Sequence, residues 1–315
     1  MSRRGWALFA AMCVIWGIPY LLIRVAVRDV SPGTLVFLRT AIGGAVLLPL
    51  ALRSGGFGSV LRRWKPLVAF AVLEIAIPWL LLGNAEQHLP SSLTGLLIAA
   101  VPLVGVVAGR LTGTGDHVDA RRWAGLLLGL LGVGLLVGLD LGSLSGLALV
   151  EVGLTVIGYA TAPIIMARQL SDLPRFPVVC AALLLSAVAW APYGLTHWPR
   201  QVAATGVASI VVLGLVCTAL AFVIFFALIA EIGPARATVI TYVNPAIAVV
   251  LGLVLLGEQF TAGMGIGFPL ILIGSVLAAS IGRPRKSDRL ADSGLRPQGS
   301  DLGPTAPGLA AGGRR

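Results

Sequence analysis

The feature that most constrains this chain is a succession of long apolar runs separated by short polar connections. A helix needs about 20 apolar residues to cross the hydrocarbon core of a membrane. With 57% hydrophobic and 11% charged residues, the chain lacks the charge to cover a water-exposed surface. The sequence therefore predicts an all-α polytopic membrane protein with ten transmembrane helices. The predicted spans are approximately 6–27, 33–52, 66–84, 92–111, 121–139, 146–168, 176–195, 207–229, 235–256 and 263–281.

The distribution of lysine and arginine predicts the orientation of these helices. If the N-terminus is cytoplasmic, nineteen basic residues fall in cytoplasmic connections or the C-terminal tail, and only Arg24, Arg28 and Arg200 fall in outer connections. Basic residues accumulate on the cytoplasmic side of membrane proteins. We therefore expect both termini to be cytoplasmic in a multi-pass protein of the cell (plasma or inner) membrane. This orientation explains the net charge of +10, and no nucleic-acid partner is predicted.

Prolines recur at matching positions in the two halves of the chain. At shifts of 143 or 144 residues, the matched pairs are Pro19 with Pro163, Arg24 with Arg168, Pro49 with Pro192, and Pro102 with Pro245. This pattern predicts duplication of a five-helix unit, residues 6–139 and 146–281. Because five is odd, the second unit is inverted relative to the first. Residues 282–315 are basic and rich in Gly and Pro, which predicts a disordered cytoplasmic tail.

Two stretches of the sequence carry a family resemblance. WGIPYLLIRVAVRDVSPGTLVFLRTAIGGAVLLPL (16–50) resembles the opening of an EamA domain, with an early Trp-Gly and then an Arg and a terminal Pro. EIGPARATVITYVNPAIAVVLGLVLLGEQFTAGMGIGFPLILIGSVL (231–277) resembles its end, with Gly-Pro-Ala, a mid-helix Pro and Leu-Gly-Glu. In the first half, Thr-Gly-Asp (114–116) replaces Leu-Gly-Glu.

The resemblance covers residues 6–281 and indicates the drug/metabolite transporter (DMT) superfamily. It implies a ten-helix carrier with a central cavity lined by the first four helices of each repeat. It also implies that the fifth and tenth helices lie at the periphery. The resemblance does not indicate which substrate is carried.

Glu74 is the strongest candidate for a coupling group. It lies about eight residues into the third predicted helix, so about 12 Å deep at 1.5 Å per residue. A carboxylate there is costly unless it is paired, hydrated or protonated. We interpret Glu74 as the proton-coupling residue. The alternative is a buried acid that bonds a neighbouring helix.

Arginines inside or beside the predicted helices are candidate anion receptors. Arg39 lies about 9 Å from the nearer end of the second helix by the same rise per residue. It could receive a substrate carboxylate or phosphate, or pair with Glu74 or Glu151 to orient the helices. Arg24 and Arg168 lie at helix ends and are interpreted as interfacial anchors.

Prolines within the predicted helices are expected to interrupt them, because each removes a backbone hydrogen bond. Lipid cannot satisfy the freed carbonyl, so it must face protein, water or substrate. The predicted break or hinge positions are Pro19, Pro78, Pro102, Pro163 and Pro245, with an unpaired further proline at Pro269.

Polar and aromatic side chains near these prolines are candidates for substrate recognition. Together with Arg39, the predicted substrate-binding residues are Trp16, Tyr20, Asn84, Tyr159, Thr161, Thr218, Phe222, Thr241, Tyr242 and Asn244, with Thr238 also near Pro245. For each of them, bonding or packing between helices is the alternative interpretation.

Small residues in the fifth helix predict close helix packing. The glycines of GLLLGLLGVGLLVG recur four residues apart at 125/129 and 134/138, and Gly263 and Gly267 open the tenth helix in the same way. A homodimer through these two helices is therefore a possible assembly. The isolated cysteines Cys13, Cys180 and Cys217 predict neither a disulfide nor a metal site, and no cofactor is predicted.

These observations predict a secondary transporter that moves a small metabolite, amino acid-like compound or drug by alternating access. Export and proton coupling through Glu74 are the favoured mode. No phosphate-binding loop is present, which disfavours a primary pump. The alternatives are an intramembrane lipid-modifying enzyme, disfavoured because all three histidines (His88, His117 and His197) lie in loops, and a membrane scaffold without transport.

Overall fold

The computed structural model describes residues 1–113, 120–138, 144–233, 237 and 239–279. Regular secondary structure in this part of the chain is entirely helical, which confirms the all-α class. In the first half the helices are α1 (Arg3–Gly17), α2 (Pro19–Ala26), α3 (Pro32–Ser54), α4 (Phe57–Arg62), α5 (Trp64–Ala71), the π-helix η1 (Val72–Ala76), α6 (Ile77–Ala85), α7 (Ser91–Ile98), α8 (Val101–Leu111) and α9 (Ala120–Gly138). In the second half they are α10 (Gly146–Gln169), α11 (Arg175–Thr196), α12 (Ala204–Gly214), the π-helix η3 (Leu215–Leu220), α13 (Ala221–Ile232), α15 (Ile240–Leu256) and α16 (Ala262–Ala279). The Thr-Gly-Asp motif, Thr238 and the predicted tail lie outside the described residues.

Within the described residues, eight continuous helical segments are long and apolar enough to cross a membrane by length and composition. They are Arg3–Ala26, Pro32–Ser54, Trp64–Ala85, Ser91–Leu111, Ala120–Gly138, Gly146–Gln169, Arg175–Thr196 and Ala204–Ile232. The ninth and tenth predicted spans correspond to the shorter apolar helices α15 and α16. The described part of α15 starts five residues after the predicted ninth span, next to positions outside the description. Eight spans therefore agree with the sequence, and the count of ten stays a prediction.

Local signals explain where several helices begin and end. Ser31 precedes α3, where its hydroxyl accepts a hydrogen bond from the amide of Thr34 and Pro32 occupies the first turn. At the other end of α3, Gly55 and Gly56 have φ angles of 69° and 85°. Residues with a side chain rarely adopt these angles, so the two glycines stop the helix and reverse the chain.

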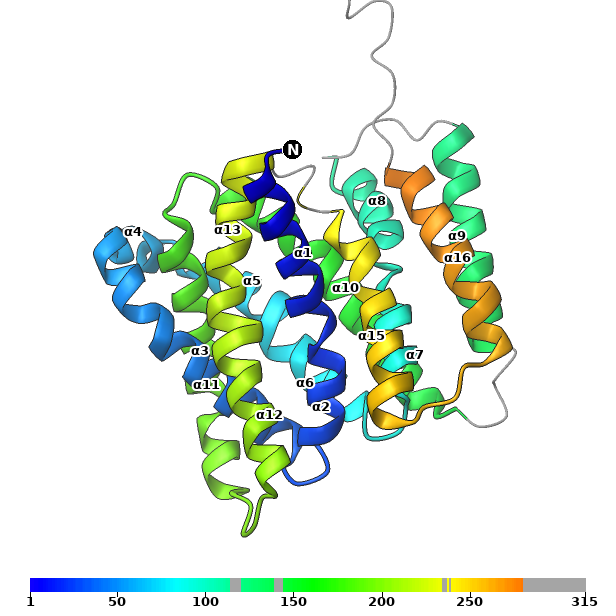
Figure 1. The fold of residues 1–315 in the computed structure, drawn as a ribbon. Coiled ribbons are helices and arrows are strands. Elements are labelled where there is room, and N and C mark those ends of the chain that lie inside the picture. The colour runs from blue at the N-terminus through cyan, green and yellow to red at the C-terminus, as the bar shows by residue number, and fades with distance from the viewer. Residues whose placement is uncertain (114–119, 139–143, 234–236, 238, 280–315) are drawn as a thin grey trace, which may run out of the picture. The chain divides into compact units, whose positions relative to one another are not determined.

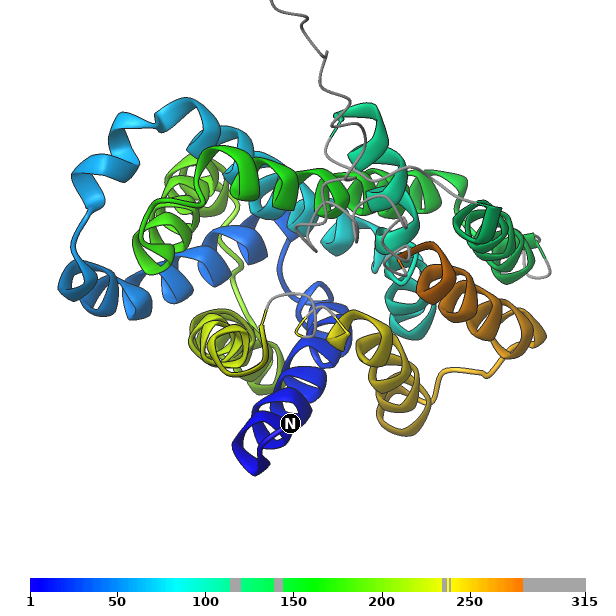
Figure 2. The same cartoon turned by 90° about the horizontal axis from the view of Figure 1, so that it is seen from above.

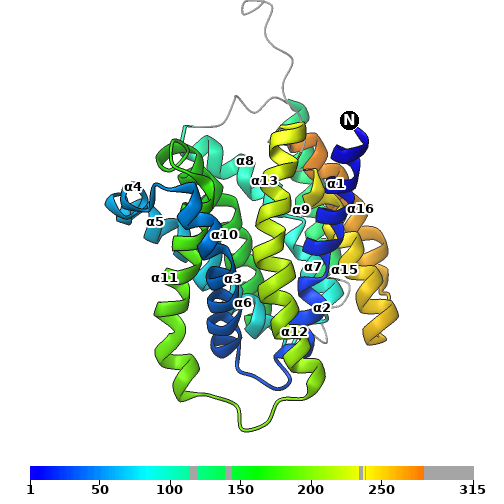
Figure 3. The ribbon, with the colours of Figure 1, turned by 60° about the vertical axis from the view of Figure 1, so that its left-hand side comes forward.

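The helices pass back and forth between two ends of a bundle (Figure 1). We call the end where α1 begins the N-terminal end, and the end where α2 finishes the opposite end. Helices far apart in sequence lie side by side: α3 packs along α11, and α1 packs between α13 and α15 (Figures 1 and 3). Residues of the two halves are therefore interleaved throughout the bundle.

Prolines affect the helices in two different ways. The helix changes at Pro19, which follows the end of α1, at Pro78, which follows η1, and at Pro102, which opens α8. At Pro163 and Pro245 the predicted interruption is corrected, because α10 and α15 continue through both prolines. Membrane helices tolerate an internal proline when neighbouring groups satisfy the freed carbonyl. Pro269 likewise lies inside α16.

Glycines allow α9 and α16 to pack closely, and the two helices lie side by side in Figures 1 and 2. A Cβ atom added to Gly132 would come within 2.7 Å of the Ile271 amide nitrogen, and one added to Gly267 within 2.7 Å of the Gly132 carbonyl oxygen. The predicted close packing is therefore present within one chain. The glycines Gly125, Gly129 and Gly132 already face neighbouring helices, and the homodimer stays a prediction.

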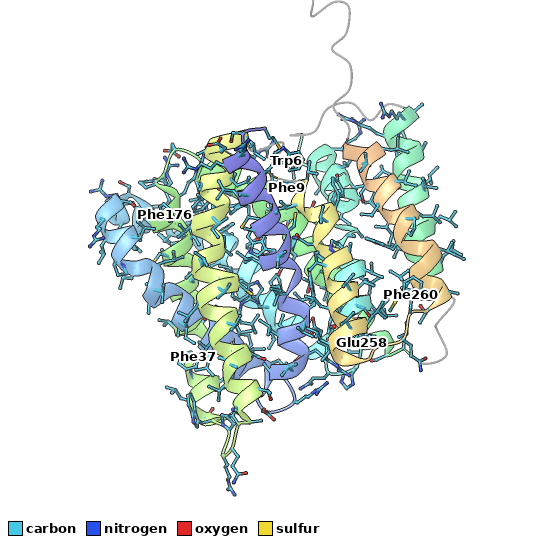
Figure 4. All side chains as sticks on the ribbon, in the orientation of Figure 1. Trp6, Phe9, Phe37, Phe176, Glu258 and Phe260 are labelled. Carbon is cyan, nitrogen blue, oxygen red and sulfur yellow. The ribbon has the colours of Figure 1, made fainter. Side chains whose placement is uncertain are left out.

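The outer surface of the bundle suits a lipid environment. Large apolar side chains are exposed on many helices, among them Leu127, Leu147, Ile157, Val188, Val254 and Ile273. Four tryptophans are 56–59% exposed and lie at helix ends: Trp6 at the start of α1 (Figure 4), Trp64, Trp123 and Trp198. Tryptophans at helix ends are typical of the two interfaces between membrane and water.

Candidate functional site

Two π-helical segments carry candidate functional side chains. Glu74 lies in η1, and Thr218 lies in η3, which begins 143 residues after η1 at the spacing that the prolines share. A π-helical turn displaces the usual hydrogen bonds and leaves backbone carbonyls available. The indole Nε1 of Trp190 donates to the Ala76 carbonyl (3.2 Å), and the Thr218 hydroxyl donates to the Leu213 carbonyl (2.8 Å). Each π-helix is thus held by a side chain that bonds a backbone carbonyl.

Arg39 lies where α3, α6 and η3 meet. Its guanidinium carbon is 3.5 Å from the centre of the Trp79 ring, within the range of a strong cation–π contact. Its Nε donates to the Thr218 hydroxyl at 3.0 Å. Gly43, one turn after Arg39 on α3, permits this approach, because a Cβ atom there would lie 2.6 Å from Thr218. The side chain is only 6% exposed, so a permanent cation is held inside the bundle.

Further polar groups act on Arg39. Tyr159, Cys217, Tyr20 and Glu86 interact with it electrostatically. Tyr20 is buried against Gly95 of α7, and Tyr159 lies beside Trp79. The structure therefore brings together four predicted residues, Tyr20, Arg39, Tyr159 and Thr218, and adds Trp79, Cys217 and Glu86, which were not predicted.

Glu74 is linked to this group of residues through Tyr159, which interacts electrostatically with both Glu74 and Arg39. The π-helix that carries it packs closely on α10: a Cβ atom added to Gly158 would lie 2.5 Å from the Leu73 carbonyl oxygen. Its Oε2 atom is buried and has no hydrogen-bond partner among the described residues. Glu74 is thus a carboxyl group at mid-helix with one oxygen left to bind a proton or a ligand.

The other predicted substrate-binding residues have different surroundings. Trp16 packs against Phe222 and Phe225, with ring centroids 6.3 and 4.7 Å away. Asn84 donates to Glu151 (3.2 Å), and this pair links α6 to α10. These contacts join neighbouring helices, and a role of Trp16, Phe222 and Asn84 in substrate recognition stays a prediction.

Three further predicted residues bond neighbouring backbone. Thr161 donates to the Ile157 carbonyl of its own helix (2.8 Å). Tyr242 donates to the Ser275 carbonyl of α16 (3.4 Å), and the Asn244 amide, with its nitrogen facing two carbonyls, donates to Cys13 of α1 (3.1 Å). Thr241 is half-buried on α15. A role of these side chains in substrate recognition stays a prediction.

Glu86, directly after α6, is fully buried, and neither carboxylate oxygen has a hydrogen-bond partner among the described residues. Arg24 donates through Nη1 to the Glu86 carbonyl oxygen rather than to its carboxylate. Nearby, the Glu258 carboxylate accepts hydrogen bonds from the amides of Ser91 (2.7 Å) and Ser92 (2.9 Å) and thereby caps α7. Burial and the negative charge of Glu258 raise the pKa of Glu86 well above its ordinary value, against the opposing effect of Arg24. Figure 4 labels Glu258 at the end of α15.

Two surface clefts of about 410 Å³ each lie at the ends of the bundle. The cleft at the opposite end is lined by Arg24, Val27, Arg28, Gln87 and His88. The cleft at the N-terminal end is lined by Gly56, Ser59, Arg62, Arg63, Asp172, Leu173 and Pro174. Neither cleft includes a predicted substrate-binding residue, and the central cavity stays a prediction.

Contacts connect the two halves at the N-terminal end. Arg63 and Asp172 form a bidentate ion pair with N···O distances of 2.6 and 2.7 Å. The guanidinium holds the pKa of Asp172 below its usual range. Arg168, interpreted from the sequence as an interfacial anchor, donates to the Thr112 carbonyl at 2.6 Å.

Comparisons with known proteins agree with this architecture. The model of the EamA-like transporter family matches the chain twice, over residues 3–138 and 146–280. The inner membrane transporter YedA of Escherichia coli K12 is 28% identical over 291 residues, which cover 86% of this chain and 89% of YedA. A transporter of Archaeoglobus fulgidus is 22% identical over 86% of this chain and 97% of its own length. A solved structure shares the fold with a TM-score of 0.63 and 22% identity over 87% of this chain and 96% of its own.

The two matches of the family model together span nearly all of the helical bundle. The relatives are named as transporters, and one of them as an inner membrane transporter. The chain therefore belongs to the EamA-like transporter family of the DMT superfamily and is a multi-pass transporter of the cytoplasmic membrane.

Proposed function

We propose that this protein is a secondary active transporter that exports a small metabolite, amino acid-like compound or drug by alternating access, with proton coupling through Glu74. In this proposal the N-terminal end of the bundle faces the cytoplasm, as the excess of basic residues there predicts. Tyr20, Arg39, Tyr159 and Thr218 contact the substrate. The other predicted recognition residues line its path or orient the helices.

The proposal includes two inverted five-helix repeats, residues 6–139 and 146–281, which rock against each other around the shared site. The twofold match of the family model supports this division, because its boundaries fall between α9 and α10. The spacing of the π-helices supports it independently, since η1 and η3 begin 143 residues apart. A duplicated unit explains why an uncommon helical form occurs twice in register.

One observation carries the proposal of proton coupling. The Oε2 atom of Glu74 is buried in a π-helical segment and no described residue donates to it. An ionised carboxylate in that state is costly, and protonation removes the cost. A carrier that binds and releases a proton at Glu74 would therefore change the charge inside the bundle, near Tyr159, which also interacts with Arg39.

The test is substrate efflux from vesicles that contain the purified protein, with and without an imposed pH gradient. We expect the gradient to accelerate flux in the wild type. Glu74→Gln should still exchange substrate, but its gradient-driven flux should be at least about tenfold lower. Glu231→Gln is the matched control, because Glu231 is an exposed acid in the last turn of α13. Wild-type flux that ignores the gradient, or full gradient-driven flux in Glu74→Gln, would contradict the proposal.

A further inference from the structure

The charge of Arg39 is buried without a counter-ion. Among the described residues the structure contains one ion pair, Arg63–Asp172, at the N-terminal end. The guanidinium Nε of Arg39 is bonded to Thr218, but its two Nη atoms have no hydrogen-bond partner among the described residues. Burying an arginine without an opposite charge is energetically unfavourable. The described part of the fold keeps this arginine at a net cost, which is consistent with a role for the charge in binding an anion.

The acids nearest in the fold do not supply this partner. Glu151 accepts its bond from Asn84, and Glu86 interacts with Arg39 only at a distance, without an ion pair. Glu74 forms no ion pair with Arg39 among the described residues. The sequence left open whether Arg39 pairs with Glu74 or Glu151, and the structure shows neither pair.

The surroundings of Arg39 orient its guanidinium for a planar anion. The ring of Trp79 covers one face of the guanidinium, and the Thr218 hydroxyl fixes its Nε edge. The Nη edge is left to donate two parallel hydrogen bonds, the geometry that matches a carboxylate. Tyr20, which also has no hydrogen bond to the described residues, is an uncharged hydroxyl donor in the same cluster.

We propose that Arg39 is the receptor for a carboxylate group, so that the transported compounds are small molecules with a free carboxylate. The inference rests on the proposed transport function, because it identifies the substrate class of the same site. A bound carboxylate would neutralise the buried charge and accept two hydrogen bonds from the Nη atoms. Neutral isosteres of the same shape cannot do this.

The first test compares matched pairs of ligands on the purified full-length protein in detergent. The probes are acetate with acetamide and benzoate with benzamide, at equal ionic strength, and the readout is the thermal unfolding midpoint. A ligand that binds only the folded state raises this midpoint. We expect each carboxylate to raise it and each amide to leave it unchanged. Equal shifts for acid and amide, or no shift with either acid, would overturn the proposal.

The second test uses variants of Arg39. Arg39→Gln removes the buried charge, so we expect a higher midpoint without ligand and at least about tenfold weaker carboxylate binding. Arg39→Lys keeps the charge but loses the planar fork, and should retain a reduced response. If Arg39 served only to hold helices together, Arg39→Gln would lower the midpoint without ligand, and that result overturns the proposal.

Two further variants guard against a folding defect or a general salt effect. Thr218→Val keeps Arg39 and its charge but removes the Nε acceptor, so the carboxylate response should weaken about tenfold. Arg28→Gln changes an arginine that lines the surface cleft at the opposite end, and should leave the response intact. Loss of the response in Arg28→Gln alone would place the binding site in that cleft and overturn the proposal.

Vesicle flux separates this inference from the proposed function. If carboxylates bind through Arg39 but are not moved across the membrane, the transport function fails and the receptor stands. If neutral compounds are transported equally well by the wild type and Arg39→Gln, the transport function stands and the carboxylate receptor fails.

Discussion

Three ionisable side chains inside this bundle are held in different ways. Arg39 is stacked on Trp79 and bonded to Thr218, yet has no counter-ion among the described residues. Glu74 has one buried oxygen without a partner, and Glu86 has two. Buried charges of this kind reduce stability, and proteins retain them mainly where they serve a function. The three residues are therefore the first positions at which to separate function from stability.

Glu86 predicts a pH dependence of stability. Its pKa is raised in the folded protein by burial and by Glu258, so the folded state holds this proton over a pH range in which the unfolded state has released it. Stability is then lost as the pH rises above the ordinary glutamate value, until the folded group also ionises. We expect Glu86→Gln to raise the thermal unfolding midpoint more at pH 8 than at pH 5.

The comparison of wild type and variant at both pH values isolates Glu86 from other titrating groups. Glu231→Gln, at an exposed acid, should give the same small change at both values. A shift for Glu86→Gln that is equal at the two pH values, or larger at pH 5, would show that the folded protein does not raise the pKa of this carboxyl.

At the scale of helices, local irregularities position the site. The Thr218 hydroxyl in η3 accepts a hydrogen bond from Arg39 and donates one to the Leu213 carbonyl. Glu74 lies in η1, which packs against α10. The change from α1 to α2 at Pro19 precedes Tyr20, which packs on Gly95. Regular packing lies away from these segments, in the glycine contact between α9 and α16. The helices at the site thus contain π-helical turns or a proline break, whereas α9 and α16 are continuous α-helices.

The contact between α9 and α16 predicts which glycines tolerate a side chain. A Cβ atom on Gly274 would lie within 2.6 Å of the Gly125 carbonyl oxygen and the Gly129 Cα atom. Gly274→Ala should therefore destabilise the protein by about 1–3 kcal/mol, because backbone must move. Gly134→Ala, where nothing lies within 4 Å, should be neutral or gain up to about 1 kcal/mol.

Unfolding by titration of a denaturing detergent into mixed micelles measures the free energy of unfolding of both variants under the same conditions. Comparable effects of the two substitutions would mean that α9 and α16 are farther apart in the membrane than in this structure.

At the scale of the whole bundle, the two halves of the chain contact each other at both ends. Arg63–Asp172 and Arg168–Thr112 connect them at the N-terminal end, and the Glu258 cap on α7 connects them at the opposite end. Alternating access requires one set of contacts to open while the other stays closed. Under the proposed mechanism, the strengths of the two sets decide which end is open in the absence of substrate.

Cys217 reports on opening at the opposite end. Cys217 is 2% exposed, so we expect it to react slowly with a thiol reagent in the arrangement seen here. Glu258→Gln replaces a carboxylate oxygen with an amide nitrogen that cannot accept the second backbone bond. We expect this variant to increase the alkylation rate of Cys217 several-fold, measured by mass spectrometry.

Cys13 and Cys180 are internal controls, because both are buried in other parts of the bundle. An equal increase at all three cysteines would indicate general unfolding. An unchanged rate at Cys217 would show that the Glu258 cap does not restrain opening.

The sequence by itself determined the membrane class, the approximate limits of most helices and the family, because apolar length, helix caps and short motifs are local properties. It also pointed to Arg39, Tyr20, Tyr159 and Thr218 as candidate site residues. It could not determine which groups surround Arg39: the bond to Thr218 joins residues 179 positions apart, and Trp79 comes from another helix. Nor could it show that α10 and α15 run through their prolines, or that Glu86 is buried without a partner. Those features depend on packing between helices distant in sequence, and only the tertiary structure decides how a buried charge is paired.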